Sequence, residues 1–538
     1  MAQIADESFK RAILNVAGWG DTDVFPFPIE NHIFYDLPDD VLGALRALAA
    51  SLSAKNTLPS EPFSMYSCLA PVGYHGFRWA TQIEPIWNAY LLGAVLQIAP
   101  QIEASRLSES DGRVYSYRFR SAPHDGLFAS DGWRDFQSRC RALAEEHAYV
   151  VAVDIADFYA RVYHHPMENA IQAVDDSGNL HSTITQVLAR LSGGTSYGLP
   201  VGGPAARMLA ELLLDTVDRL LLIEASTKNF VRYADDYRFF VNTLPDAYRA
   251  IGYLSEKLQR NQGLSLQKSK TRIMKSAEYI SILDPVELPA GSAAKFLSLH
   301  IHFDPYSATP VEDYERLNAK IQEFDILGML RHELTKGRVN AALTRRLVGA
   351  LKFMDGETRW QALLSLLENV DTLAPVWPQV MLAFRDCLKD LSDERIEQAH
   401  EEIRRLINEN HHVAQIDLNL SYMVRVLGQK HSSQNAELLM RIYGGPHGFG
   451  SGPAPNLQRD IMLTLAKWNV RFWLSDQKSY VESMHPWVKR AFIIASSQMG
   501  DEGRFWRTSA RRGYTPFEEV IKKWVGDKMN NNSWEIPI

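Results

Sequence analysis

The chain has 538 residues, more than one ordinary hydrophobic core can hold, so two or three domains are expected. A hydrophobic content of 46% and a charged content of 22% are typical of a soluble globular protein, and no run of about 18 apolar residues predicts a membrane span. The formal net charge of −7 excludes a protein covered in basic surface, so a nucleic acid would have to bind in a local channel.

Cysteine usage and the N-terminus indicate where the protein is found. Cys68, Cys140 and Cys387 are far apart and form no C-x-x-C pair, which fits a reducing compartment. Residues 1–6 have neither the basic start nor the apolar core of a secretory signal. We therefore expect a cytoplasmic protein with no membrane partner.

The N-terminal part of the chain mixes helical and irregular stretches. Asp39–Leu52 has apolar residues at helical spacing and predicts a helix. Trp87–Leu107 has the same spacing, and we expect Pro100 to break that helix. Val114–Phe119 alternates between polar and aromatic or apolar residues, a pattern that predicts a strand.

The next part of the chain combines a buried strand with a glycine-rich turn. His147–Ile155 is a short, nearly continuous apolar run that predicts a central strand, with Asp154 at its exit. Gly198–Pro204 is a glycine-rich turn that opens a strongly periodic helix, Ala205–Glu224. Three acidic residues occupy what we take to be the polar positions of that helix: Glu211, Asp215 and Asp218.

Asn229–Val241 predicts a β-hairpin, because two aromatic and β-branched runs flank a polar pair. The pair is Asp235 and Asp236, two like charges beside an apolar sheet, an arrangement that is unfavourable unless something cancels the charges. A divalent cation with hard oxygen ligands, Mg²⁺, would do so. The alternative is an ordinary hairpin with a solvated Asp-Asp turn.

From Val311 onward helical periods dominate, and Pro305–Pro310 has the composition of a linker. Successive amphipathic helices suggest an α-helical repeat array, although no fixed period is present. The clearest periods cover Tyr314–Leu330, Val339–Phe353, Thr358–Leu367, Val376–Leu391 and Asp393–Asn408. Two pairs of adjacent histidines, His164-His165 and His411-His412, would point apart on a helix, so we interpret them as surface or core residues and not as zinc ligands.

Three carboxylates are candidates for chemistry. Asp154 leaves a central strand, and Asp235 and Asp236 lie at a hairpin tip that can neighbour it in the same sheet. Two metal ions held by such a group stabilise the attacking and leaving oxygens of an in-line phosphoryl transfer. Lys270 is a candidate general acid for the leaving pyrophosphate.

These residues resemble the palm motifs of reverse transcriptases. Asp154–Tyr159 resembles the first motif and Tyr233–Asp236 the third. Gly198–Gly202 resembles the second motif and Leu266–Thr271 the fourth. Lys295–Ile301 is similar to the primer-grip strand. Four motifs in the right order are a far more specific signal than any one of them.

The resemblance implies a role for each matching residue. Asp154 and Asp235 would bind two Mg²⁺ ions, for which Mn²⁺ can substitute, with Asp236 beside them and the Ile155 carbonyl as a minor ligand. Lys270 would protonate pyrophosphate.

The resemblance also implies how the nucleotide is held. Tyr159 would be the steric gate that excludes a 2′-hydroxyl and so selects deoxynucleotides. Gly202 lies in the flexible turn under the nascent base pair. Arg78 is matched to the fingers arginine that grips the triphosphate, with an exposed strand arginine as the alternative.

Three positions depart from template-copying relatives. Val201 stands where these usually carry Gln, Ala206 where they carry Ser, and Glu211 where they carry Asn. This version of the second motif resembles the abortive-infection and defence-associated reverse transcriptases of bacteria. That resemblance implies a polymerase that acts against phage, assembles as a trimer or hexamer, and adds deoxynucleotides without a conventional template or from a protein tyrosine. Some members of the group use a partner non-coding RNA instead.

The predicted fold is therefore α+β: a right-hand polymerase palm and fingers followed by an α-helical repeat-like domain. We expect an N-terminal or fingers region over residues 1–147, a reverse-transcriptase palm over 148–304 and the helical domain over 311–538. The predicted substrates are deoxynucleoside triphosphates, and the predicted product is single-stranded DNA.

Three alternatives remain open from sequence. The first is a template-copying reverse transcriptase that uses a partner non-coding RNA. The second is a scaffold whose non-catalytic palm only binds nucleic acid or a phage protein. The third, more remote, is a nucleotide cyclase, against which the Gly-Leu-Pro turn and Tyr159 speak.

Overall fold

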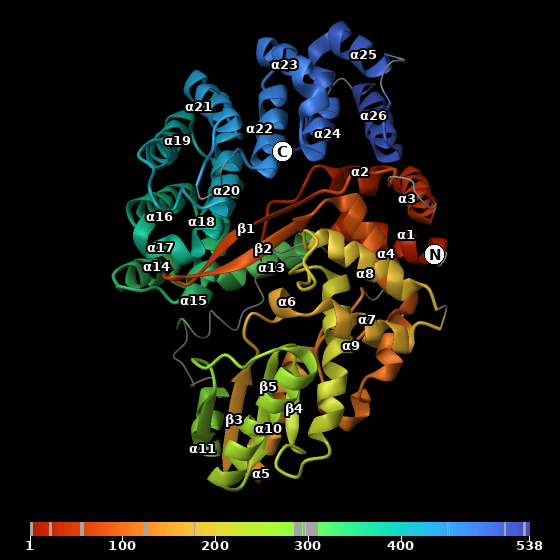
Figure 1. Ribbon diagram of the computed structural model, residues 1–538. Coiled ribbons are helices and arrows are strands. Elements are labelled where there is room, and N and C mark those ends of the chain that lie inside the picture. The colour runs from red at the N-terminus through yellow and green to blue at the C-terminus, as the bar shows by residue number, and fades with distance from the viewer. Residues whose placement is uncertain are drawn as a thin grey trace. The chain divides into compact units, whose positions relative to one another are not determined.

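The computed structural model describes residues 4–20, 24–53, 59–121, 126–176, 178–283, 293, 296, 310–448, 450, 452–509, 513–530 and 534–538. The chain divides into two compact units, which are described separately (Figure 1). The first unit comprises Met1–Ser67, Ala80–Asp284 and Arg512–Gly526, and the second comprises Cys68–Trp79, Pro285–Arg511 and Asp527–Ile538. The three-domain division over 1–147, 148–304 and 311–538 stays a prediction.

The first unit joins an N-terminal group of helices to a four-stranded sheet and the helices that cover it. Its helices are α1 (Asp6–Trp19), α2 (Glu30–Asp36), α3 (Pro38–Ser53), α4 (Pro85–Ser105), α5 (Gly132–Glu146), α6 (Phe158–Arg161), α7 (His164–Val174), α8 (Leu180–Leu191), α9 (Pro204–Leu221), α10 (Leu244–Gln262) and α11 (Ser276–Leu283). The last helix of the chain, α26 (Pro516–Met529), begins in this unit.

The sheet has the strand order β4-β5-β3-β6, and every neighbouring pair is antiparallel. Its strands are β3 (Tyr149–Asp154), β4 (Phe230–Tyr233), β5 (Asp236–Val241) and β6 (Arg272–Lys275). The predicted hairpin is thus confirmed as β4 and β5, and β3 is confirmed as a central strand. Helices α5 and α11 enclose an apolar core with Val150, Val231 and Phe240, while α10 packs against β3 and β5.

Two sequence predictions for this unit are wrong. Val114–Phe119 makes only isolated bridges, Val114 to Arg232 and Phe119 to Phe128, because buried arginine side chains take carbonyls that a strand ladder would use. Helix α4 runs through Pro100 without a break. It is buried on nearly all sides and packs against α1 and α9, so tertiary packing offsets the one lost backbone hydrogen bond.

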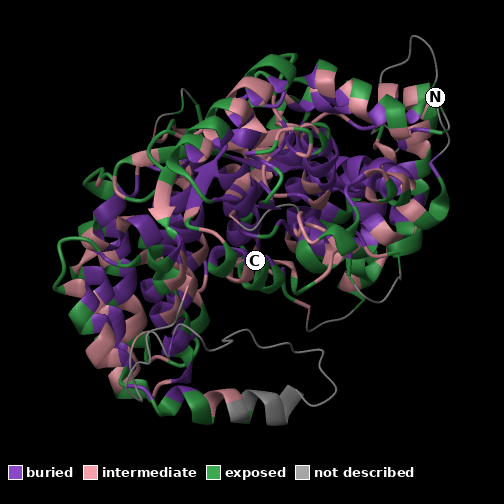
Figure 2. Ribbon diagram, turned by 90° about the horizontal axis from the view of Figure 1, so that it is seen from below, coloured by how far each residue is buried: buried purple, intermediate pink, exposed green. Residues whose placement is uncertain are grey.

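The second unit is helical apart from the tip of a hairpin. Its helices are α13 (Pro310–Gln322), α14 (Ile326–Leu334), α15 (Ala341–Ala350), α16 (Gly356–Glu368), α17 (Val370–Leu373), α18 (Trp377–Leu388), α19 (Asp393–Asn408), α20 (Asp417–Leu427), α21 (Ser433–Gly444), α22 (Pro455–Lys467), α23 (Arg471–Gln477), α24 (Pro486–Ala495) and α25 (Gly500–Thr508). Buried residues lie in the interior of each unit, and exposed residues lie on its outer helices (Figure 2).

The predicted helix Tyr314–Leu330 is two helices. Asp325 caps α14 by accepting the Gly328 N–H at 2.8 Å, so the chain turns where the apolar spacing runs on. The helix predicted over Asp393–Asn408 is confirmed with those bounds as α19. A repeat architecture stays a prediction, and the primer-grip stretch Lys295–Ile301 lies outside the described residues except for Phe296.

The hairpin of β1 (Met65–Val72) and β2 (Gly76–Ile83) has its tip in the second unit. There the Tyr74 hydroxyl donates to the Thr372 carbonyl at 2.7 Å and accepts the Val339 N–H at 2.8 Å. These two hydrogen bonds fix the tip to α17 and to Val339, which lies just before α15.

No helix among the described residues is both long and apolar enough to cross a membrane.

Candidate active site

Asp154, Asp235 and Asp236 converge at one corner of the sheet, here called the aspartate corner. Asp154 is the last residue of β3 and lies opposite Asp236, the first residue of β5. Directly opposite residues of an antiparallel pair have Cβ atoms about 5 Å apart. Asp235 lies in the turn between β4 and β5, and its carbonyl accepts the Ile155 N–H at 3.2 Å. The structure therefore brings together the carboxylates that the sequence placed on a strand end and a hairpin tip.

The carboxylates of the corner are not equivalent. Burial and neighbouring negative charge together raise the pKa of Asp235 to about 6. Burial has the largest effect, and the charge of Asp154 contributes more than that of Asp236. Asp236 Oδ1 lies 3.3 Å from Arg238 Nη1, which supplies a counter-charge. Asp154 and Asp235 thus form the more strongly repelling pair.

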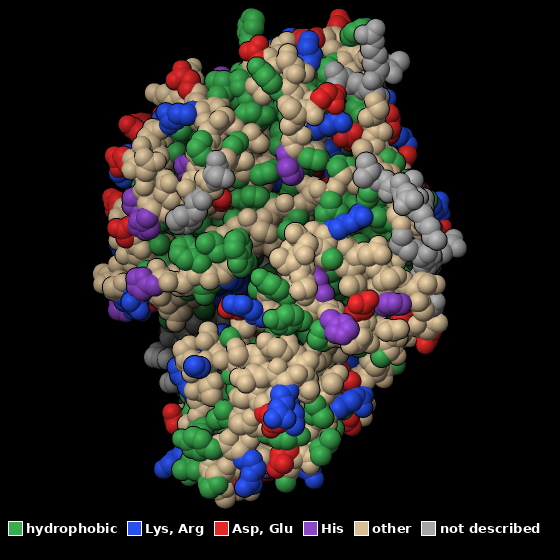
Figure 3. All heavy atoms as spheres, viewed as in Figure 1, with side chains coloured by type: hydrophobic (Ala, Val, Ile, Leu, Met, Phe, Trp, Pro, Cys, Tyr) green, Lys and Arg blue, Asp and Glu red, His purple; other side chains and the backbone are tan. Residues whose placement is uncertain are grey.

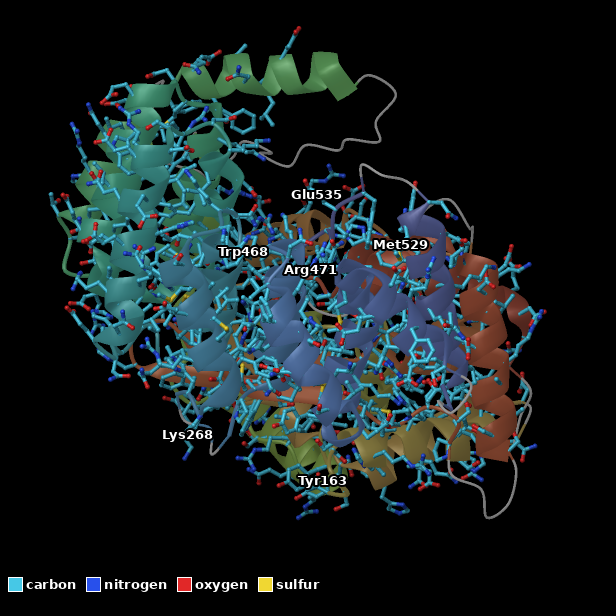
Figure 4. The ribbon with its side chains drawn as sticks, turned by 90° about the horizontal axis from the view of Figure 1, so that it is seen from above. Tyr163, Lys268, Trp468, Arg471, Met529 and Glu535 are labelled. Carbon is cyan, nitrogen blue, oxygen red and sulfur yellow. The ribbon has the colours of Figure 1, made fainter. Side chains whose placement is uncertain are left out.

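Lys270 is the cation of this corner. Its Nζ lies 2.7 Å from Asp154 Oδ2, and this hydrogen bond raises the pKa of Lys270, so the ammonium carries its proton at neutral pH. Lys268, on the same loop, is exposed and points away from the protein (Figure 4). Lys270 and Arg238 bring two positive charges to three carboxylates, and the repulsion at Asp235 remains. An all-oxygen donor set with this excess charge fits a hard divalent cation, which Asp154, Asp235 and the Ile155 carbonyl would hold.

The glycine-rich turn is tied to the start of α6. The Leu199 N–H donates to the Tyr159 carbonyl at 2.8 Å, and His164 Nε2 lies 2.9 Å from the Gly198 carbonyl oxygen. Gly198 and Gly202 have φ angles of 105° and 109°, which L side chains rarely adopt, so both positions need glycine. The second motif therefore has a fixed position relative to Tyr159.

Tyr159 lies among the groups of the site. Burial raises the pKa of its phenol well above the usual value, and Tyr117, Glu211, Arg207 and Asp235 are the charges that perturb it most. The Arg207 guanidinium lies over the Tyr117 ring, 5.1 Å from its centroid. Tyr159 is thus half-buried within the electrostatic reach of Asp235, and its role as a steric gate stays a prediction.

Arg78 is exposed on β2, within the hairpin tip that belongs to the second unit, and its role in gripping the triphosphate stays a prediction.

A buried arginine that the sequence analysis missed binds the turn that carries Asp235. Arg232, in the middle of β4, is 0% exposed. It donates to Asp218 Oδ2 at 2.6 Å, to Glu211 Oε1 at 3.1 Å and to the Ala234 carbonyl at 3.0 Å. Ala234 has a φ of 52°, a left-handed conformation that is unfavourable for a residue with a Cβ. Arg232 therefore ties the strained residue before Asp235 to helix α9.

The other members of this arginine cluster complete its hydrogen bonds. Glu211 Oε2 accepts from Arg106 at 2.6 Å, and Glu211 Oε1 accepts from Ser116 at 2.5 Å. The Tyr237 hydroxyl donates to Asp218 Oδ1 at 3.1 Å. Burial opposes ionisation of Glu211, but the two guanidinium groups outweigh it and its pKa ends below the usual value.

The placement of the acidic residues of α9 on polar positions is therefore wrong for all three. Glu211 and Asp218 are each 1% exposed, and Asp215 is 9% exposed. Glu211 and Asp218 are seven residues apart, two helical turns, and so lie on one face of α9. A charged residue at Arg232, inside an otherwise apolar strand, was the signal in the sequence that could have revealed their partner.

Residues 106–327 match the family model described as reverse transcriptase (RNA-dependent DNA polymerase). The chain contains a reverse transcriptase domain. All three aspartates, Lys270, Tyr159 and the glycine-rich turn lie inside the matched stretch of this nucleic-acid polymerase domain. The comparison with curated proteins finds no match.

Two solved structures are distant likenesses. Telomerase from Candida albicans, in complex with a fragment of telomeric RNA, is 11% identical over 67% of this chain, with a TM-score of 0.30. Apo telomerase from Candida tropicalis is 10% identical over 87% of this chain and 76% of its own, with a TM-score of 0.33. The chain spans 66% of the length of the Candida albicans telomerase chain, just under two thirds.

Proposed function

We propose that the chain is a magnesium-dependent DNA polymerase that acts through the aspartate corner. The observation that carries the proposal is the convergence of Asp154 and Asp235 inside the reverse transcriptase domain, where burial and the charge of Asp154 raise the pKa of Asp235 to about 6. Such a pair is stabilised when a divalent cation binds, and Mn²⁺ has the same preference for oxygen ligands.

Each residue of the site has a role in this proposal. When bound, the metal ions supply Lewis-acid stabilisation of the phosphoryl charge. Asp154 and Asp235 hold them, with Asp236 beside them and the Ile155 carbonyl as a further ligand. Lys270, protonated and 2.7 Å from Asp154, is positioned to give a proton to the leaving pyrophosphate.

The nucleotide is selected on the other side of the corner. The Tyr159 ring lies under the sugar and rejects a 2′-hydroxyl, so deoxynucleoside triphosphates are the substrates and single-stranded DNA is the product. Gly202 keeps the turn beneath the base pair free of side chains. In this proposal Arg78, on the hairpin of β1 and β2, grips the triphosphate.

The proposed biological role is defence of a bacterial cell against phage, with untemplated or protein-primed synthesis by a cytoplasmic trimer or hexamer. It rests on the resemblance carried by Val201, Ala206 and Glu211. Glu211 also has a structural role, because it pairs with the buried Arg106 and Arg232, and an Asn there could not neutralise two guanidinium groups. The mixed acidic and basic surface in Figure 3 fits a polymerase that binds nucleic acid locally.

The test uses the purified chain with Mg²⁺ and each labelled deoxynucleotide, without added template or primer. The comparison variant is Asp235→Asn, and the matched control is Asp157→Asn, an exposed left-handed aspartate two residues after Ile155. Labelled product is expected with the wild type and Asp157→Asn, and it should fall at least about 1,000-fold with Asp235→Asn. Product that shifts on protease treatment supports protein priming.

A template-copying reaction is the second candidate, because the matched family is described as RNA-dependent. Synthesis that appears only when an RNA is supplied, and that copies its sequence, would support it. No aspartate-dependent synthesis under either condition, including RNA from phage-infected cells, would support the scaffold alternative.

A further inference from the structure

Asp371, His411 and His412 form a group of metal-ligating side chains in the second unit, on elements that the polymerase site does not use. Asp371 lies on α17, and the two histidines lie in the loop between α19 and α20. His411 Nε2 is 3.3 Å from Asp371 Oδ1, and His412 Nε2 is 3.7 Å from the same oxygen. Their ring centroids are 4.5 Å apart.

The adjacent histidines do not point apart, contrary to the sequence interpretation. Helix α19 ends at Asn408, and Asn410 has a φ of 54°, so His411 and His412 follow a left-handed turn outside the helix. The angular separation of successive helical side chains therefore does not apply to them. Both imidazoles reach the carboxylate of α17 instead.

We propose that Asp371, His411 and His412 bind a divalent transition-metal ion of the Zn²⁺ class. One ligand atom from each residue lies within 4.8 Å of the other two. Bonds of about 2.0–2.1 Å in a tetrahedral site put neighbouring ligand atoms about 3.3 Å apart, close to the two distances from Asp371 Oδ1. Two imidazoles and one carboxylate are a donor set for zinc and its neighbours, and not for Mg²⁺, which prefers oxygen.

The hydrogen bonding and exposure of the group are compatible with an ion. The Val413 N–H donates to His411 Nδ1 at 3.4 Å, so an ion bound at Nε2 would move the ring proton to Nδ1 at the loss of this one long hydrogen bond. The side chains of His412 and Asp371 are 62% and 78% exposed, so an ion can enter from solvent and keep a water ligand.

Such an ion would cross-link two parts of the second unit. It would join α17 to the loop between α19 and α20, next to Thr372, whose carbonyl holds the Tyr74 hydroxyl of the hairpin tip. The site is therefore expected to stabilise the second unit around this anchor, independently of the proposed polymerase reaction.

The test is a Zn²⁺ titration of the full-length, chelator-treated chain in the Asp235→Asn background with excess Mg²⁺, so that the aspartate corner does not contribute. Binding of one Zn²⁺ and a rise in the thermal unfolding midpoint are expected. His411→Ala combined with His412→Ala should weaken binding at least about 100-fold and abolish the rise, and Asp371→Asn should weaken it less.

The matched control is His332→Ala, which removes an exposed histidine of α14 in the same unit and should leave binding unchanged. The proposal is overturned if the chain with all three residues binds no Zn²⁺, or if the double histidine variant binds it as tightly.

Discussion

Two groups of carboxylates lie next to the turn that joins β4 to β5, and they differ in how far cations neutralise them. In the arginine cluster, Glu211 and Asp218 share the guanidinium of Arg232, and Glu211 also binds Arg106. In the aspartate corner, Lys270 and Arg238 contact Asp154 and Asp236, and neither forms a direct ion pair with Asp235.

The pKa values express this difference. The pKa of Glu211 is lowered although the residue is fully buried, because two guanidinium groups outweigh the burial. The pKa of Asp235 is raised to about 6, because burial is reinforced by the charge of Asp154. Within the first group burial still raises the pKa of Asp218 in spite of Arg232, so the guanidinium groups outweigh burial at Glu211 alone. At Asp235 no guanidinium offsets burial, and an added cation would do so.

The turn between β4 and β5 is fixed by the arginine cluster and still carries the repelled carboxylate of Asp235. Arg232 belongs to this cluster and donates to the Ala234 carbonyl, one residue before Asp235. The arginine cluster thus holds Asp235 in place. Substitutions in the two groups should therefore change stability in opposite directions.

Breaking the arginine cluster should have the largest effect. Arg232→Gln leaves Asp218 buried with only the Tyr237 hydroxyl, and the free energy of unfolding should fall by about 3–5 kcal/mol. The measurement is urea denaturation followed by circular dichroism. Arg219→Gln, which removes a half-exposed partner of Asp215, should cost about 0.5 kcal/mol or less. A loss below about 1 kcal/mol for Arg232→Gln would contradict a structural role for the cluster.

Relieving the repulsion at Asp235 should stabilise the chain. In metal-free buffer at pH 7, Asp235→Asn should raise the free energy of unfolding by about 3 kcal/mol, since the pKa is raised from 3.8 to about 6 and one pKa unit corresponds to about 1.4 kcal/mol. The folded pKa of about 6 exceeds the unfolded value near 3.8, so ionisation destabilises the folded state as pH rises between them. The gain should therefore be absent below about pH 4 and complete above about pH 6.

The same experiment with Mg²⁺ sharpens the comparison. Saturating Mg²⁺ should raise the unfolding midpoint of the wild type and have little effect on Asp235→Asn, which removes the cancelled charge. Equal stabilisation of both proteins would place the ion somewhere other than the aspartate corner.

The smallest effect is expected at Asp236. Its carboxylate is one-third exposed and lies 3.3 Å from Arg238, so Asp236→Asn should change the free energy of unfolding by less than about 0.5 kcal/mol in metal-free buffer. Calorimetric or denaturant measurements beside Asp235→Asn provide the test. A gain as large as that of Asp235→Asn would mean that the two aspartates share the repulsion equally.

Much of the candidate site could be predicted from short patterns. The hairpin with Asp235 and Asp236, the central strand ending in Asp154 and the glycine-rich turn were all readable, because each is encoded within about ten neighbouring residues. The roles assigned to these residues stay predictions, as do the repeat architecture and the defence function.

What could not be predicted depends on contacts between distant residues. Arg106 and Glu211 are 105 positions apart, and no local pattern shows that the Glu211 side chain of α9 is buried against Arg106. Similarly, only packing against α1 and α9 carries α4 through Pro100. The convergence of His411 and His412 on Asp371 requires the end of α19 and the left-handed Asn410, which the sequence interpretation did not include.

By itself, the sequence determined the order of the polymerase motifs and the residues that meet at the sheet corner, because strand and turn propensities are local. Only the tertiary structure decided which carboxylates are neutralised and which are left to repel. Burial and pairing are set by partners that can be more than a hundred positions apart in the sequence, as Arg106 and Glu211 are. The free energy of a buried charge depends on those partners more than on its neighbours in sequence.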